Sequence, residues 1–78
     1  MDKNEILAKL YEFAAEAFGV DASTLTAETN PAELGNTSQK IVAMSAAIEN
    51  EFEVMVPVAK FSKFESFDEL ADYIEEEA

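Results

Sequence analysis

Apolar residues recur with helical spacing along the first part of the chain. Between residues 3 and 18 the apolar side chains return every three or four positions: Ile6, Leu7, Leu10, Phe13, Ala14, Ala17 and Phe18. Asp2 followed by Glu5 is typical of a capping box at a helix start, and Gly19 is typical of the residue just after a helix end. The pattern therefore predicts an amphipathic helix over about residues 3–18.

A long polar connection follows this helix. Between residues 20 and 35 the periodicity is interrupted, and the large apolar residues are Val20, Leu25 and Leu34. Connections of this length are uncommon in a compact domain and are often functional.

A second helix is predicted over about residues 37–52. Its apolar stripe has helical spacing: Ile41, Met44, Ile48 and Phe52. Asn36 and Gln39 match a capping box, and if Asn36 is the cap, Ser38 is the second helical residue with its side chain toward solvent. A helix N-terminus favours anions, so a serine at this position is well placed to carry a phosphate ester. The simpler interpretation is that Ser38 only helps to start the helix.

The last third of the chain predicts two further helices. Pro57 favours the first turn of a short helix through residues 58–61, after apolar packing by residues 54–56. Ser66 and Glu69 form another capping box before a periodic apolar set: Phe67, Leu70, Ala71 and Ile74. Ala43, Ala46 and Ala47 allow either close helix packing, which we favour, or room for a sequestered acyl chain. The expected fold is all-α, a small four-helix bundle with one short helix, in a single domain over residues 1–78.

The amino-acid composition disfavours several classes of function. The formal net charge is −12, from 17 carboxylates and 5 lysines, which repels nucleic acids and anionic membranes and attracts basic protein surfaces. The chain has no cysteine and no histidine, which disfavours zinc and leaves a catalytic serine without its usual base. The residues from position 21 onward lack the spacing of a calcium loop. We therefore expect no catalytic residue and no metal site.

The length of the apolar runs and the first residues of the chain indicate where the protein is located. No apolar run approaches the length of a membrane span, and the first residues lack the pattern of a signal peptide. We expect a free-standing, monomeric, cytoplasmic protein that binds neither membrane nor nucleic acid.

Three stretches together resemble a known family. Residues 34–38 read Leu-Gly-Asn-Thr-Ser, residues 48–52 read Ile-Glu-Asn-Glu-Phe, and Val56 precedes Pro57. With the helix order and the acidity, they resemble an acyl carrier protein over roughly residues 3–76. The segment from Val56 to Phe61 is similar to the D-alanyl carrier branch, which indicates a specialised carrier.

The resemblance implies a function and a site. Ser38 falls where the family attaches 4′-phosphopantetheine, on which acyl or aminoacyl cargo is held as a thioester in lipid or secondary metabolite biosynthesis. Glu49 and Glu51, with Glu53 just beyond, fall on the acidic ridge that meets basic partner enzymes. Those partners are a phosphopantetheinyl transferase and the enzymes that load and process the cargo.

The site departs from the usual Asp-Ser-Leu of the family. Thr37 or Asn36 can replace the aspartate as a cap, but Gln39 replaces an apolar residue that faces the transferase. Lys40 also stands where fatty-acid carriers have an acid. Two alternatives remain open. One is an unmodified carrier-fold protein that acts as an acidic protein-interaction module, and the other is an acidic mimic of DNA. The second explains the charge but not the surroundings of Ser38.

Overall fold

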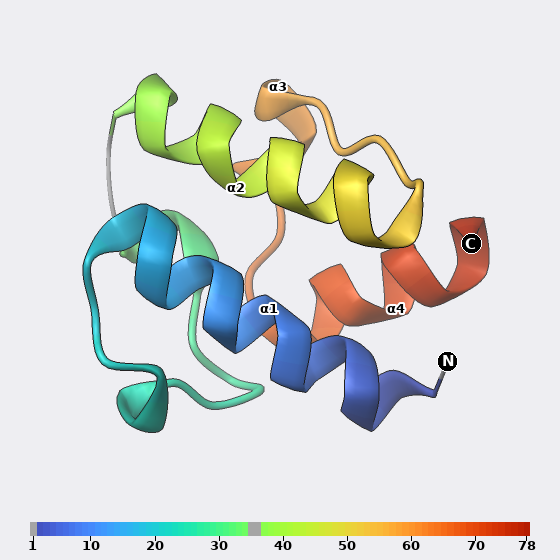
Figure 1. The fold of residues 1–78 in the computed structure, drawn as a ribbon, viewed down its shortest axis with the longest axis horizontal. Helices are drawn as coiled ribbons and strands as arrows, with labels where there is room; N and C mark the ends of the chain where they lie inside the picture. The colour runs from blue at the N-terminus through green and yellow to red at the C-terminus, as the bar shows by residue number, and fades with distance from the viewer. Residues whose placement is uncertain (1, 35–36) are drawn as a thin grey trace.

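The computed structural model of the chain describes residues 2–34 and 37–78. Within these residues the elements are helical, as Figure 1 shows. In chain order they are α1 (Lys3–Phe18), η1 (Ala22–Thr24), η2 (Pro31–Glu33), α2 (Ser38–Phe52), α3 (Val58–Phe61) and α4 (Phe67–Glu77). The predicted all-α bundle, with three longer helices and one short one, is confirmed. Gly35 and the predicted cap Asn36 lie outside the described residues.

Both ends of α1 follow from single residues. The Asp2 side chain accepts a hydrogen bond from the Glu5 backbone N–H at 2.9 Å, which satisfies one of the amides that a helix start leaves without an intrahelical partner. At the other end Gly19 has φ 71°, and its N–H donates to the Ala15 carbonyl at 3.0 Å. Glycine adopts this left-handed conformation without steric strain. The predicted bounds of the first helix are confirmed.

The core lies where α1 packs against α2 on one side and against α4 on the other (Figure 1). Its largest fully buried side chains come from all four helices: Ile6, Leu10, Met44, Ile48, Phe61, Phe67, Leu70 and Ile74. Full burial of each contributes roughly 1.5–3 kcal/mol relative to exposure. The apolar stripes read from the sequence are therefore the core-facing sides of the helices.

The exposure of the alanines on α2 contradicts the prediction that they serve close helix packing. Ala43 and Ala46 are exposed and Ala47 is half-buried, so close helix packing does not explain this group as a whole. They lie away from the buried stripe of Ile41, Met44 and Ile48 because the helix turns about 100° per residue.

The long connection supports α4. Leu25 and Pro31 are buried, and they anchor the connection to the bundle. The carbonyls of Thr29 and Ala27 accept hydrogen bonds from the first amides of α4, those of Phe67 and Asp68, at 2.9 Å each. The connection thus holds the start of the last helix.

Ser66 is the predicted cap of α4, and its hydroxyl oxygen accepts from the Glu69 N–H at 3.2 Å. The Glu69 carboxylate accepts from the N–H of Glu65, one residue before the cap, at 3.2 Å. The capping box is therefore present in a form shifted by one residue.

Candidate functional site

Ser38 is the first residue of α2 and is exposed. The cap is Thr37, whose hydroxyl accepts from the Lys40 N–H at 3.4 Å and whose carbonyl accepts from Lys40 and Ile41 at 3.2 and 3.3 Å. Of the two caps that the sequence allows, Asn36 and Thr37, the structure has Thr37, so Ser38 is the first helical residue and not the second as the capping box of Asn36 and Gln39 predicts. A threonine suffices as the cap because it offers both oxygens at this bend of the chain.

The surroundings of the Ser38 hydroxyl suit an anionic substituent. The first-turn amides of a helix point outward and leave a partial positive charge at its start. The first turn of α2 contains no acidic residue that would neutralise this charge. The exposure of Ser38, Gln39 and Lys40 leaves room for a large group on the serine oxygen. A phosphodiester at Ser38 therefore fits this position.

One face of α2 continues from Ser38 toward the end of the helix. Val42 follows four residues later and is 52% exposed. Glu49 is eleven residues from Ser38, three helical turns and within about 20° of the same face, at an axial separation of about 16 Å. The serine, an exposed apolar residue and a carboxylate thus lie along one line of the surface.

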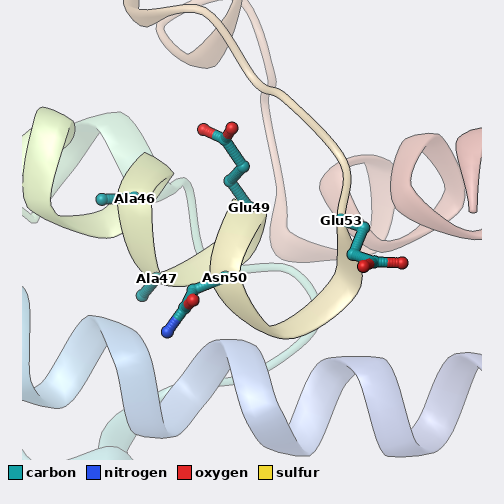
Figure 2. A pocket seen from close by; sticks show the side chains of 5 residues that line it. All are labelled: Ala46, Ala47, Glu49, Asn50 and Glu53. Carbon is teal, nitrogen blue, oxygen red and sulfur yellow. The ribbon is translucent and has the colours of Figure 1, made fainter.

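The three predicted docking acids do not lie together. Glu49 and Glu53 are four residues apart, so they lie near the same side of the helix end. Glu51 is two residues from each of them and therefore lies on another side. All three are exposed. Figure 2 shows the Glu49 and Glu53 carboxylates pointing in different directions rather than toward one another. Glu49 therefore lies on the Ser38 side, Glu51 lies on another side of α2, and the Glu53 carboxylate points in a third direction from the end of the helix.

Glu53 has a strained backbone. It follows the last residue of α2 with φ 59° and ψ 32°, and its N–H donates to the Glu49 carbonyl at 2.8 Å. This left-handed conformation costs a residue with a side chain roughly 1–2 kcal/mol, and glycine is the usual occupant. A charged side chain is kept here against the local preference of the backbone.

Gln39 lies on a different line of the helix surface. Ala46 is seven residues and Asn50 eleven residues further, so these three residues share one exposed side. Ala46 and Asn50 also line an open, shallow hollow with Ala47, Glu49 and Glu53 (Figure 2). Gln39 therefore presents a polar group beside Ser38, without packing against the core.

The shifted pKa values lie outside α2. Hydrogen bonds to Asp68 at 2.7 Å and to Asp72 at 2.8 Å raise the pKa of Lys3 above its usual value. The backbone N–H and hydroxyl of Ser23 lower the pKa of Asp21. Burial, and then nearby carboxylates, raise the pKa of Tyr11. These groups support the fold and none belongs to the surface around Ser38.

Within residues 2–34 and 37–78, no group of three or more acidic side chains is arranged to hold a metal ion. None of the described helices is both long enough and apolar enough to cross a membrane.

Sequence reasoning missed three exposed apolar side chains, of which Val42 lies on the same helix as Ser38. Val42, Met55 and Val58 are 52%, 65% and 36% exposed. Val42 falls outside the helical stripe of Ile41, Met44 and Ile48, and this signal could have identified it. Met55 and Val58 stand in a run of apolar residues whose alternation gives no clear face, so the sequence did not separate them from the core.

Comparison with known proteins identifies what the chain is similar to. The family described as "Phosphopantetheine attachment site" matches residues 8–74. A protein named "Acyl carrier protein" from Rubrobacter xylanophilus is 34% identical over 77 residues, which cover 97% of this chain and 95% of the relative. No solved structure gives a significant match.

Proposed function

The chain belongs to the acyl carrier protein family, and from this premise we propose that Ser38 is the residue to which 4′-phosphopantetheine is attached. The family consists of carriers rather than catalysts, and its cofactor is bound covalently. The proposal concerns which residue of this chain holds the cofactor, what it then carries and which surface its partners use.

The environments of the five serines support Ser38. The Ser23 hydroxyl donates to Asp21 at 2.8 Å, and the Ser62 hydroxyl donates to the Ala59 carbonyl at 3.0 Å. Ser66 caps α4, and the Ser45 hydroxyl is buried. Ser38 is exposed at a helix start, and its hydroxyl has no hydrogen bond to any residue that the structure describes. This difference in environment is the observation that carries the proposal.

The chain needs an external group for its function because it contains no cysteine. The phosphopantetheine supplies a thiol on which acyl or aminoacyl cargo is held as a thioester. The residues of the chain hold the attachment point: Thr37 fixes the start of α2, and the buried side chains of Ile41 and Met44 fix the helix to the core. Ser38 is thereby presented away from the bundle.

The surface beside Ser38 supports docking of basic enzymes. The −12 net charge steers cationic surfaces toward the chain. Glu49 supplies a carboxylate on the Ser38 side of α2, Val42 supplies exposed apolar area between it and the serine, and Glu53 adds a carboxylate at the helix end. Glu51 contributes charge from another side. We propose that a phosphopantetheinyl transferase and the enzymes that load and process the cargo bind here, with Gln39 at the edge of the contact.

The test is modification of the purified chain with coenzyme A and a broad-specificity phosphopantetheinyl transferase, followed by intact mass measurement. The chain should gain one phosphopantetheine group, and Ser38→Ala should gain none. Ser62→Ala is the matched control because it also removes an exposed serine hydroxyl, and it should be modified at the original rate. Modification of Ser38→Ala would contradict the assignment.

A second candidate function is an interaction module that is never modified. The exposed polar Gln39 directly after Ser38 favours it, because an apolar contact for the transferase is missing there. This candidate predicts no mass gain with any transferase tested, including those of the native host.

A further inference from the structure

Ser45 has a hydroxyl group that the fold leaves unsatisfied. The residue lies on α2 and is half-buried, but its Oγ atom is buried and has no hydrogen-bond partner among the residues that the structure describes. A buried hydroxyl without a partner destabilises a fold, because its hydrogen bonds to water are lost and not replaced. Alanine would avoid this cost and is also the better helix former. The serine at this position is therefore unfavourable for folding alone.

The position of Ser45 relates it to Ser38. Ser45 is seven residues after Ser38, which is two helical turns, an axial separation of about 10 Å and within about 20° of the same face. Glu49, four residues further, points away from α1 in Figure 2, and Figure 1 shows α3 packed on that side of α2. Ser45 therefore lies beside the exposed line from Ser38 to Glu49, at the edge next to α3. Because the residue is only half-buried, rotation about its χ1 bond can bring the hydroxyl to this line.

We propose that Ser45 is a positioning residue for the phosphopantetheine arm, and that its hydroxyl hydrogen-bonds the arm amide nearest the thiol. The inference rests on attachment of the arm to Ser38. The carbonyl of that amide is about ten bonds from the serine oxygen, and an extended chain advances roughly 1.1–1.2 Å per bond, which gives a reach of roughly 11–12 Å. The amide nearer the phosphate is about six bonds away and reaches only roughly 7 Å. The amide beside the thiol is thus the one that reaches Ser45.

The side chains along α2 match the chemistry of the arm in the same order. The part of the arm next to the phosphate carries two methyl groups, and Val42, the first residue on the line after Ser38, is exposed and apolar. The amide follows further along the arm, and Ser45 follows Val42 along the helix. A hydroxyl suits an amide because it can donate to the carbonyl or accept from the N–H. The contact would hold the thiol end of the arm against α2 rather than free in solvent.

The experiment compares unmodified and modified forms of the original chain, Ser45→Ala and Ser45→Thr. Intact mass first establishes that each modified form bears one phosphopantetheine group. NMR with isotope-labelled pantetheine then measures the nuclear Overhauser effect between the arm amide proton beside the thiol and the protons of residues 45 and 46. The effect should be present in the original chain and about threefold or more weaker in Ser45→Ala. Ser45→Thr retains a hydroxyl and should restore it.

Thermal unfolding gives an independent readout. Modification should raise the melting temperature of the original chain by about 2–5 °C and that of Ser45→Ala much less. The unmodified Ser45→Ala chain should be at least as stable as the unmodified original, because it loses an unsatisfied hydroxyl. Ser23→Ala is the matched control, since it removes a serine hydroxyl from η1, which packs against α1. It should leave the effect of modification unchanged.

Three results would count against the proposal. An Overhauser effect of equal strength in modified Ser45→Ala and in the modified original chain would overturn it. So would equal stabilisation of both chains by modification, because the hydroxyl would then be satisfied within α2, as serines can be by the carbonyl four residues earlier. A chain that gains no mass would instead contradict the assignment of Ser38, and with it this inference.

Discussion

The two ends of α2 carry charges opposite to those that stabilise a helix. The start has no acidic residue in its first turn and bears Lys40, while the end bears Glu49 and Glu51 and has no basic residue in its last turn. A helix dipole favours acids at the start and bases at the end, by about 0.3–1 kcal/mol for each exposed charge. The start of α1 differs, since Asp2 caps it and Glu5 lies in its first turn.

The start of α2 is the end that differs, because α1 and α4 have acids in their first turns, whereas all three helices lack a basic residue in their last turns. The start leaves a partial positive charge available for an anion on Ser38. The end concentrates carboxylates, and Glu53 extends them although its backbone conformation favours glycine. Natural proteins depart from local rules mainly at functional sites. The charges of α2 and the position of Ser38 therefore support the same interpretation.

The largest expected effect comes from reversing the charges at the end of α2. Glu49→Lys combined with Glu51→Lys should raise the apparent KM of the transferase for the carrier about tenfold, because basic enzymes lose their steering. The same variant should be more stable by about 0.5–2 kcal/mol, because the new charges suit the dipole. Transferase kinetics and thermal unfolding measure the two effects.

The matched control places the same charge change on α1. Glu12→Lys with Glu16→Lys alters exposed residues and leaves α2 intact, so KM should change much less. Equal effects of the two double variants would show that only the net charge matters and would remove the distinction between the ends of α2.

A second test sharpens the role of the first turn. Gln39→Leu should increase the rate of modification by a broad-specificity transferase by about threefold to tenfold, because one more apolar side chain is buried on docking. Asn50→Leu adds the same group on the same side of the helix, away from Ser38, and should have little effect. If Gln39→Leu leaves the rate unchanged, Gln39 does not limit recognition.

The strain at Glu53 gives a smaller effect on stability. Glu53→Gly should increase the free energy of unfolding by about 0.5–1 kcal/mol, since relief of the left-handed strain exceeds the entropy that glycine adds to the unfolded chain. Glu53→Ala keeps the strain and removes the charge, so it separates the two contributions. Chemical denaturation measures both variants. A Glu53→Gly variant less stable than Glu53→Ala would contradict the strain argument.

The smallest effect concerns Lys3, a cation that α1 keeps at its start through ion pairs with Asp68 and Asp72. The fold raises the pKa of Lys3, so its ion pairs stabilise the folded state fully below pH 10.5, the ordinary pKa of lysine. This stabilisation decreases as the pH rises above that value. Tyr11 acts in the same direction, because burial raises its pKa above 10.0 and disfavours its ionised form. The melting temperature should therefore fall above about pH 10.

Lys3→Met isolates the contribution of the ion pairs. The variant should be slightly less stable than the original chain at pH 7 and should lose less stability between pH 9 and pH 11, as thermal unfolding followed by circular dichroism would show. An identical alkaline slope in both proteins would assign the effect to Tyr11 and to charge repulsion alone.

Periodicity predicted the helices because each buries one side against the core. Asp2, Gly19 and Ser66 fixed helix ends through local hydrogen bonds, which depend only on neighbouring residues. The sequence does not decide between Asn36 and Thr37 as the cap of α2, because both residues have suitable side chains and the choice depends on the backbone bend.

Contacts between segments far apart in the chain could not be predicted from the sequence pattern. The link from Tyr73 to Met55, the support of α4 by Thr29 and the exposure of Val42 all depend on how the helices pack. The separation of Glu51 from Glu49 followed from helical geometry once the helix was established. The position of Ser38 at a helix start was predictable. The contrast between its environment and those of the other serines required the structure.

Attachment of the cofactor to Ser38 is tested most directly by the intact mass of the chain purified from its native host, compared with the same measurement on Ser38→Ala. The account predicts a mass increased by one phosphopantetheine group, with or without cargo, and fragmentation that assigns the increase to Ser38. It also predicts no increase in the variant. A folded native chain of unmodified mass, in cells where another carrier is modified, would contradict the central claim.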